Sequence, residues 1–250
     1  MTPETALGIY EQPALREVTG AAIRPGGLAL TDKALALYAL PAGAKVLDVG
    51  CGAGATVERL REYYHFAALG LDLSASLLQF GHHQNATLPL LQAEGEHLPV
   101  GRGLLDAVIA ECSLSVMGDA DQALDEFRRV LKAGGLLILS DIYARRPEGV
   151  PALRYLPPGS CLSGAISQAQ IADRLRAHGF QLTLWQDHSD TLKQLAVQLI
   201  FAHGSMQSFL QQIASGADSA DGSAVGAEIE RATRTARPGY YLLLAQKGEV

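Results

Sequence analysis

The chain has 250 residues, 48% of them hydrophobic, and a formal net charge of −6. This length is enough for one α/β domain with a full buried core. The basic residues form no strong cluster, which argues against a nucleic-acid-binding surface. No apolar run is long enough to cross a membrane and residues 1–12 lack the features of a signal peptide, so we expect a cytoplasmic protein.

Residues 1–40 precede the first predicted strand and are expected to form two helical pieces, separated at Arg24-Pro25-Gly26-Gly27. Thr31 is predicted to cap the second piece. A bare sheet offers such a segment no internal partner. We therefore expect residues 1–40 to be a helical lid across the C-terminal ends of the strands, with residues 41–250 as the main domain. The alternative is a helix that only covers core surface. Tyr10 and Arg24 are the lid side chains for which we predict substrate or cofactor contact.

The sequence KVLDVGCGAG, at Lys45–Gly54, predicts a buried strand that runs into a glycine-rich turn. The glycines allow a sharp turn and a close approach to a ligand. A helix is expected from Ala55, with its N-terminus facing that ligand. A second strand, residues 66–71, ends at Asp72, where doubly wound folds place the carboxylate that holds a ribose diol.

The spacing Gly50-x-Gly52-x-x-Ala55, with Asp72, also satisfies a dinucleotide fingerprint. Asp48 favours a different nucleotide ligand, one with a cationic tail. A carboxylate just before the glycines repels the pyrophosphate of a dinucleotide and attracts a positive charge. S-adenosylmethionine carries a sulfonium and an ammonium group. Asp48, Gly50, Gly52 and Gly54 resemble motif I of the class I SAM-dependent methyltransferases, and Asp72 resembles the ribose-binding acidic residue of that family. Cys51 is expected to contribute only its backbone to this site. Leu73, next to Asp72, is also predicted to bind the cofactor.

A helix over residues 74–85, capped by Ser74, and a third strand over residues 88–93 should follow. The next residues, Glu94-Gly95-Glu96-His97-Leu98-Pro99, resemble the family's D-A-x-x-L-P motif, in which the acidic residue and the next backbone amide recognise adenine. The resemblance therefore implies adenine contacts for Glu94, Gly95 and Glu96.

The fourth strand, residues 104–110, is expected to place Glu111 and Cys112 at its C-terminal end, facing both cofactor and substrate. The later run EFRRVLKAGGLLILSD resembles the family signature E-x-x-R-V-L-K-P-G-G, with Ala133 in place of proline. It predicts a helix at 121–131 and a fifth strand at 136–140, followed by Asp141.

The remainder of the chain predicts the last elements of the sheet. These are helices at 168–178 (capped by Ser167), 191–213 and 228–235, a linker at 215–226, and strands at 181–185 and 240–245. The family resemblance implies a doubly wound, seven-stranded Rossmann-like α/β sheet whose last strand is antiparallel and lies between the fifth and sixth.

The three cysteines, Cys51, Cys112 and Cys161, form no CxxC pair, which predicts reduced thiols. Cys112 and Cys161 resemble in position two cysteines of the arsenite methyltransferases, whose thiolates would hold a trivalent arsenical. Adjacent His82 and His83 point about 100° apart on a helix, so we predict no metal site.

The sequence thus predicts an enzyme that transfers a methyl group from S-adenosylmethionine to a small-molecule acceptor, with no nucleic-acid or membrane partner. It identifies no catalytic base, and it leaves the oligomeric state open. One alternative is thiol-dependent methylation of trivalent arsenicals through Cys112 and Cys161. Another is a nucleotide-binding module without catalysis.

Overall fold

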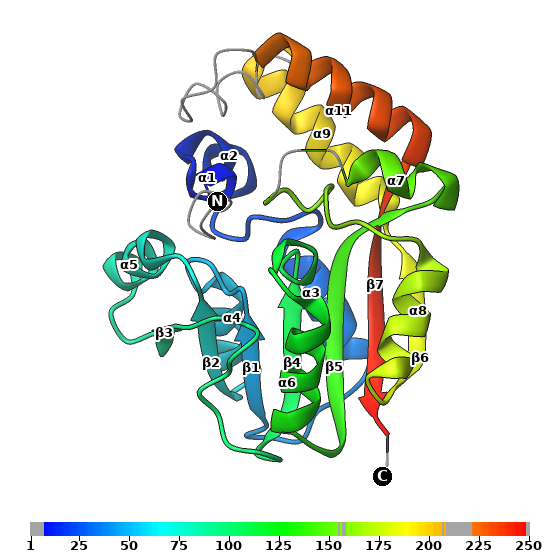
Figure 1. The fold of residues 1–250 in the computed structure, drawn as a ribbon. Helices are drawn as coiled ribbons and strands as arrows, with labels where there is room; N and C mark the ends of the chain where they lie inside the picture. The colour runs from blue at the N-terminus through cyan, green and yellow to red at the C-terminus, as the bar shows by residue number, and fades with distance from the viewer. Residues whose placement is uncertain (1–7, 155, 157–158, 207, 209–221, 249–250) are drawn as a thin grey trace.

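The structure is a computed structural model, and it describes residues 8–154, 156, 159–206, 208 and 222–248. Seven strands in this part of the chain form one sheet with the order β3-β2-β1-β4-β5-β7-β6 (Figure 1). Their bounds are β1 Lys45–Val49, β2 Ala67–Asp72, β3 Leu90–Gln92, β4 Leu105–Glu111, β5 Leu131–Ala144, β6 Phe180–Asp187 and β7 Pro238–Lys247.

The first five strands pair in parallel, and β7 pairs antiparallel with both β5 and β6. From β1 the chain winds outward to β2 and β3 on one side, and to β4 and beyond on the other. The sheet therefore has its topological switch point between β1 and β4, where open α/β sheets bind ligands. The predicted fold class, including the antiparallel last strand, is confirmed.

Helices cover both faces of the sheet (Figure 1). They are α1 Gly8–Glu11, α2 Pro13–Thr19, α3 Gly27–Leu37, α4 Ala55–Glu62, α5 Ala75–Gln84, α6 Ala120–Val130, α7 Val150–Leu153, α8 Gln168–Ala177, α9 Ser189–His203 and α11 Gly222–Ala236, with short 3-10 turns η2 Leu114–Val116 and η3 Pro147–Gly149. Among the described residues, no helix combines the length and the apolar character that crossing a membrane would require.

Alternate side chains of the central strands enter two separate cores. In β1, Val46 packs in the cluster that includes Leu60 of α4, whereas Leu47 packs in the cluster that includes Phe127 of α6. Helix α3 joins the first cluster through Leu30, and its Asp32 receives two hydrogen bonds from Arg59 of α4, at 3.0 and 2.9 Å. Such continuous burial makes the central strands almost uniformly apolar.

Several element boundaries differ from the sequence predictions, and β5 begins at Leu131 instead of residue 136. The helix expected to be capped by Thr31 begins at Gly27, so Thr31 lies inside α3. Asp141 lies within β5, because that strand pairs with β7 as far as Ala144. Helix α9 ends at His203, and the predicted continuation to residue 213 falls largely outside the described residues. The segment 222–226, predicted as linker, is the first part of α11.

The N-terminal helices α1 and α2 lie on the side of the sheet where β1 and β2 end (Figure 1). Two hydrogen bonds attach this segment to the main domain. The Ser74 hydroxyl donates to Glu11 Oε1 at 2.5 Å, and the Cys161 amide donates to the Tyr10 hydroxyl at 3.0 Å. Residues 8–24 therefore stand across the loops that follow the strands.

Candidate functional site

The glycine turn after β1 is held against the end of β2. The amides of Gly50 and Cys51 both donate to the Leu71 carbonyl, at 2.8 and 2.9 Å. Gly50 has φ +78°, and a Cβ added to it would stand 2.3 Å from Cβ of Ser113. Only glycine satisfies both the backbone conformation and this close approach.

Asp72 connects this turn to helix α5. Its two oxygens accept from the amide of Gly52, at 2.7 Å, and from the amide of Ser74, at 2.8 Å. Burial raises the pKa of Asp72 although these amide hydrogen bonds oppose the shift. The Ser74 hydroxyl caps α5 by accepting from the Leu77 amide, as the sequence predicts. The predicted ribose carboxylate and the glycine turn are thus in direct contact.

A cavity of about 1140 Å³ opens beside this turn. It brings together most of the predicted cofactor residues, which line it from four different loops: Gly50, Cys51, Gly52, Asp72, Leu73, Glu94, Gly95, Glu96, Glu111 and Cys112. Tyr10 and Arg24 line it from the N-terminal segment. Asp48, Gly54 and Cys161 are not among the lining residues.

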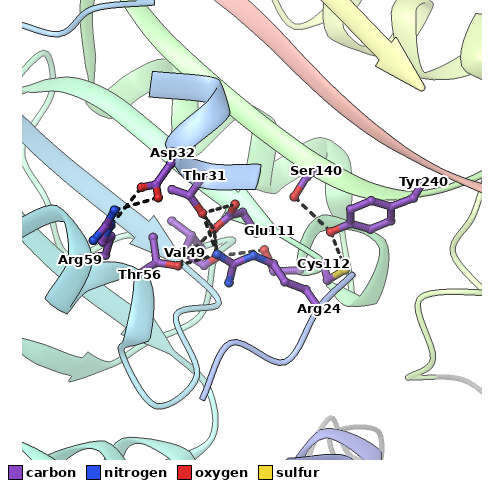
Figure 2. A network of polar contacts seen from close by, with 11 residues as sticks. Arg24, Thr31, Asp32, Val49, Thr56, Arg59, Glu111, Cys112, Ser140 and Tyr240 are labelled. Atoms are coloured by element: carbon purple, nitrogen blue, oxygen red, sulfur yellow. Dashed lines mark hydrogen bonds and ion pairs between the residues drawn. The ribbon is translucent and has the colours of Figure 1, made fainter. Parts of the chain in front are cut away.

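In the wall of the cavity, Arg24 and Glu111 form a buried ion pair. Arg24 Nη2 lies 2.8 Å from Glu111 Oε2, and the two side chains are 7% and 3% exposed. The hydroxyls of Thr31 and Thr56 each accept from Arg24 Nη2, at 2.7 and 2.9 Å, and each donates to Glu111 (Figure 2). The network joins α3 and α4 to the end of β4.

Asp48 lies close to this network and is almost fully buried. Burial, together with the nearby Glu111 carboxylate, raises the pKa of Asp48 from 3.8 to about 8, although Arg24 opposes the shift. In the absence of a further positive charge, the Asp48 carboxyl is therefore mostly protonated at neutral pH.

Cys112 begins the loop after β4 in a left-handed conformation, with φ +54°. Its Sγ lies 3.1 Å from the hydroxyl of Tyr240, which also lies 3.1 Å from the Ser140 hydroxyl (Figure 2). Burial and the nearby Asp141 and Cys161 raise the pKa of the Cys112 thiol well above its ordinary value. Burial and Asp141 likewise raise the pKa of Cys161 to about 12. Both thiols are protonated at neutral pH.

Sequence reasoning missed the polar side chains that hold this site together. The hydroxyls of Thr31 and Thr56 form hydrogen bonds with both members of the Arg24–Glu111 pair. The Ser113 hydroxyl donates to the Val49 carbonyl at 2.7 Å. Thr56 had a usable signal, since it stands next to the first residue of the helix that follows the glycine turn. Arg154, which directly follows α7, also lines the cavity.

Comparison with known proteins relates this chain to methyltransferases. Residues 47–139 match a methyltransferase domain model. The chain is 29% identical to an uncharacterised methyltransferase, YodH, of Bacillus subtilis over 177 residues, which are 69% of the chain and 74% of that relative. These matches support a class I SAM-dependent methyltransferase. The enzyme is therefore a methyltransferase with S-adenosylmethionine as its cofactor, and the non-catalytic alternative is set aside.

The relatives of this methyltransferase act on different acceptors. An 18S rRNA (guanine-N7)-methyltransferase of Arabidopsis thaliana is 30% identical over 188 residues, which are 73% of the chain and 61% of that protein. An arsenite methyltransferase of Aquipseudomonas alcaligenes is 29% identical over 157 residues, 57% of the chain and 45% of that protein. In fold, the chain is similar to the [4+2]-cyclase SpnF, with a TM-score of 0.77, 23% identity and coverage of 100% and 98%.

The residues around the glycine turn fit an adenosyl cofactor. An added Cβ at Gly52, which lines the cavity, would find only Leu77 Cδ1 within 4 Å, at 4.0 Å. The backbone there is thus open to a ligand that a larger residue would displace. When bound, S-adenosylmethionine supplies an electrophilic methyl group on a cationic sulfur.

Proposed function

We propose that this methyltransferase modifies a small-molecule acceptor that binds beside the cofactor in the cavity of about 1140 Å³. That volume is the observation that carries the proposal, because single-ligand pockets hold roughly 300–1,000 Å³. The cavity wall has two parts, one for the cofactor and one for the acceptor. One part consists of the glycine turn, Asp72 and Glu94, and the other includes Tyr10, Ile23 and Leu156.

In this proposal the cofactor part of the cavity is formed by the residues that the family resemblance indicates. Asp72 would hold the ribose, and Glu94 with the Gly95 amide would face the adenine. Gly95 packs closely, since an added Cβ would stand 2.7 Å from Cε of Met117. The backbone of Gly50 and Gly52 would lie along the amino-acid end.

The charges around the cavity support a small acceptor over a nucleic acid. Five carboxylates line it, those of Asp72, Glu94, Glu96, Glu111 and Asp119, against two arginines, Arg24 and Arg154. Arg24 is neutralised by Glu111. A phosphate backbone would be repelled at such a wall, since nucleic-acid affinity depends on neutralising phosphates with basic side chains.

Methyl transfer requires mainly that the acceptor be aligned with the methyl group and that water be excluded. The N-terminal segment is positioned for both tasks. We propose that it acts as a lid, with Tyr10 closing the acceptor side while its hydroxyl accepts from the Cys161 amide. No ionised base is required of the chain in this scheme.

The test is methyl transfer from radiolabelled S-adenosylmethionine into three separated fractions of a cell extract: small metabolites, protein and RNA. We expect label in the metabolite fraction. Label confined to RNA or protein would refute the proposal. Gly50→Val, which fills the glycine turn, serves as the control for contaminating activity.

A second acceptor, a trivalent arsenical, is supported by the proximity of Cys112 and Cys161, each of which lies close enough to Tyr10 to raise its pKa. Both thiols would have to lose their protons to soft arsenic. Turnover of arsenite or methylarsenite with glutathione, lost in both Cys112→Ser and Cys161→Ser, would support this acceptor. Unchanged turnover in both variants would eliminate it.

A further inference from the structure

A second, smaller cavity adjoins the one that would hold the cofactor and the acceptor. Its volume is about 240 Å³, which is room for about eight water molecules. It lies on the sheet face that α6 and α8 cover, with Leu124 and Leu175 in its wall (Figure 1). The residues that line both cavities are Ser115, Met117, Gly118, Arg154, Ser163 and Gly164. They belong to the loops after β4 and β5, so the smaller cavity borders the acceptor part of the larger one.

Two polar side chains from neighbouring strands stand at the buried end of this cavity. Asp141 of β5 is paired in register with Tyr241 of β7, and the two residues are 2% and 3% exposed. The Tyr241 hydroxyl makes no hydrogen bond with any described residue. Its ring is stacked on Trp185, with 4.6 Å between the ring centroids. Because buried hydroxyls are almost always hydrogen-bonded, the partner of this one must come from the contents of the cavity.

The Asp141 carboxylate has no counter-ion in the described part of the chain. It accepts from the Ser115 amide at 3.0 Å, from the Ser115 hydroxyl at 2.7 Å and from the Ile142 amide at 2.8 Å. Burial raises the pKa of Asp141 to about 6, and only these hydrogen bonds oppose the shift. The group is therefore mostly ionised at neutral pH. A ligand that brings a positive charge would stabilise it.

Two arginines line the same cavity nearer to solvent. The Arg174 side chain is 35% exposed, and its Nε lies 2.9 Å from Asp121 Oδ1. Arg154 is exposed and forms no ion pair or hydrogen bond with the described residues. The cavity is thus negative at its buried end and positive at its open end. Such a charge distribution is complementary to a zwitterion.

We propose that the smaller cavity binds the amino-acid group of the acceptor. The ammonium group would face Asp141 and Tyr241, and the carboxylate would face Arg154 and Arg174. The rest of the molecule would extend into the larger cavity, toward the methyl group. This inference rests on the proposed small-molecule acceptor and names its class, an amino acid or a derivative that keeps both charged groups. The cofactor's own amino-acid end is a separate group, since the glycine turn does not line this cavity.

The first test measures binding without methyl transfer. Each of the common amino acids, at millimolar concentration, would be added to the enzyme saturated with S-adenosylhomocysteine, which keeps the cofactor site occupied. We expect at least one to bind saturably in calorimetry and to raise the unfolding temperature. Its deaminated and decarboxylated analogues, which each lack one charged group, should bind at least about tenfold more weakly.

Tyr241→Phe separates ligand binding from a structural role. It removes a hydroxyl that has no partner among the described residues, so the free energy of unfolding should hardly change, whereas amino-acid affinity should fall about tenfold. Tyr143→Phe is the matched control, because the Tyr143 hydroxyl donates to Asp187 at 2.9 Å and Tyr143 does not line the cavity. It should lower stability and leave amino-acid binding unchanged.

Arg154→Gln tests the position of the carboxylate. It should weaken binding of the amino acid about two- to fivefold, as for an exposed ion pair, and should not weaken binding of the decarboxylated analogue. Arg176→Gln removes the same charge from an exposed pair with Asp173 outside the cavity lining, and should change neither affinity.

Three binding results would overturn the assignment. They are failure of every amino acid to bind beside S-adenosylhomocysteine, equal affinity for an amino acid and either of its analogues, and native affinity in Tyr241→Phe. An equal effect of Arg154→Gln and Arg176→Gln would place the carboxylate elsewhere.

The labelled metabolite from the methyl-transfer experiment gives a second readout. It should be retained by a cation exchanger in acid and by an anion exchanger in base, as an amino acid is. A labelled metabolite that fails on either exchanger would refute the amino-acid class and leave the proposed small-molecule acceptor intact. Label confined to RNA or protein would refute the proposed function, and the binding measurements would still decide whether the cavity holds an amino acid.

Discussion

Asp48 has the site's clearest effect on stability. Its pKa is about 8 in the folded chain and 3.8 when unperturbed, so between these values the folded state holds a proton that the unfolded state has released. The free energy of unfolding should therefore fall as pH rises from about 4 to about 8, by up to about 1.4 kcal/mol per pH unit. Urea unfolding at several pH values should show a flatter profile for Asp48→Asn. An equal slope in the variant would contradict the buried, protonated carboxyl.

The same carboxyl predicts proton release on cofactor binding. The sulfonium of S-adenosylmethionine lowers the pKa of a nearby acid, whereas S-adenosylhomocysteine lacks that charge. Near pH 7, binding of the methyl donor should release more protons than binding of the product. Calorimetry in buffers of different ionisation enthalpy measures the difference, and Asp48→Asn should abolish it. Equal proton release by both ligands in the native enzyme would refute the linkage.

Removing one member of the Arg24–Glu111 pair should lower the free energy of unfolding more than replacing both members with apolar residues does. Glu111→Ala leaves a buried guanidinium without its carboxylate, and we expect a loss of about 3–5 kcal/mol in unfolding free energy. Arg24→Leu with Glu111→Leu should cost less than the sum of the single changes. Lys193→Ala, at an exposed pair with Asp190, is the control and should cost less than about 1 kcal/mol. Additive losses in the double-mutant cycle would mean that the two groups do not interact.

Among the structural elements, the glycine turn after β1 has the least tolerance for change. Gly50→Ala would combine strain at φ +78° with a Cβ 2.3 Å from that of Ser113, and so should abolish binding of S-adenosylhomocysteine. Gly43→Ala is a matched control, since Gly43 has φ +71° but nothing within 4 Å of the added Cβ. It should cost only about 1–2 kcal/mol of stability and leave binding intact. Calorimetry and thermal unfolding would separate the two effects. Normal binding by Gly50→Ala would refute the close approach.

The strands and their order were predictable because their signals are local. Apolar runs that end in glycine or aspartate mark buried parallel strands, and the Ser74 and Ser167 caps depend on residues three positions away. Thr31 shows where such reasoning fails. Threonine is a good cap, but its partner here is Glu111, 80 residues later. The start of α11 was missed because small polar residues favour linkers, whereas burial of Ala232 and Ala236 favours the helix.

In the candidate site, too, local sequence motifs were predictable and contacts between distant residues were not. The residues of the glycine turn, Asp72 and Glu94 were predictable from motifs that the resemblance supplied. The lid contacts were not, because Tyr10 and Cys161 are 151 residues apart and only the fold brings them together. No local pattern reveals that Asp48 lies behind the cavity wall, or that Arg24 and Glu111 are paired.

On the scale of the whole molecule, charge predicts how the two cofactor forms respond to salt. The chain has a net charge of −6, and carboxylates outnumber cations at the cavity. S-adenosylmethionine has a net positive charge near neutral pH, and S-adenosylhomocysteine has none. Raising ionic strength from about 0.05 to about 0.5 M shortens the screening length from about 14 to about 4 Å. It should weaken binding of the methyl donor several-fold and that of the product much less.

Titration calorimetry at a series of sodium chloride concentrations would measure both ligands. Glu96→Gln removes one lining carboxylate that also accepts from the Asp119 amide, and it should reduce the salt dependence for the donor alone. Glu17→Gln, on α2 and absent from the cavity lining, removes the same one negative charge from the chain and serves as the control. If both variants changed the salt dependence alike, the total charge would be responsible. A larger effect of Glu96→Gln would show that the cavity's own carboxylates attract the cationic donor, since a field from nearby charges exceeds one spread over the surface.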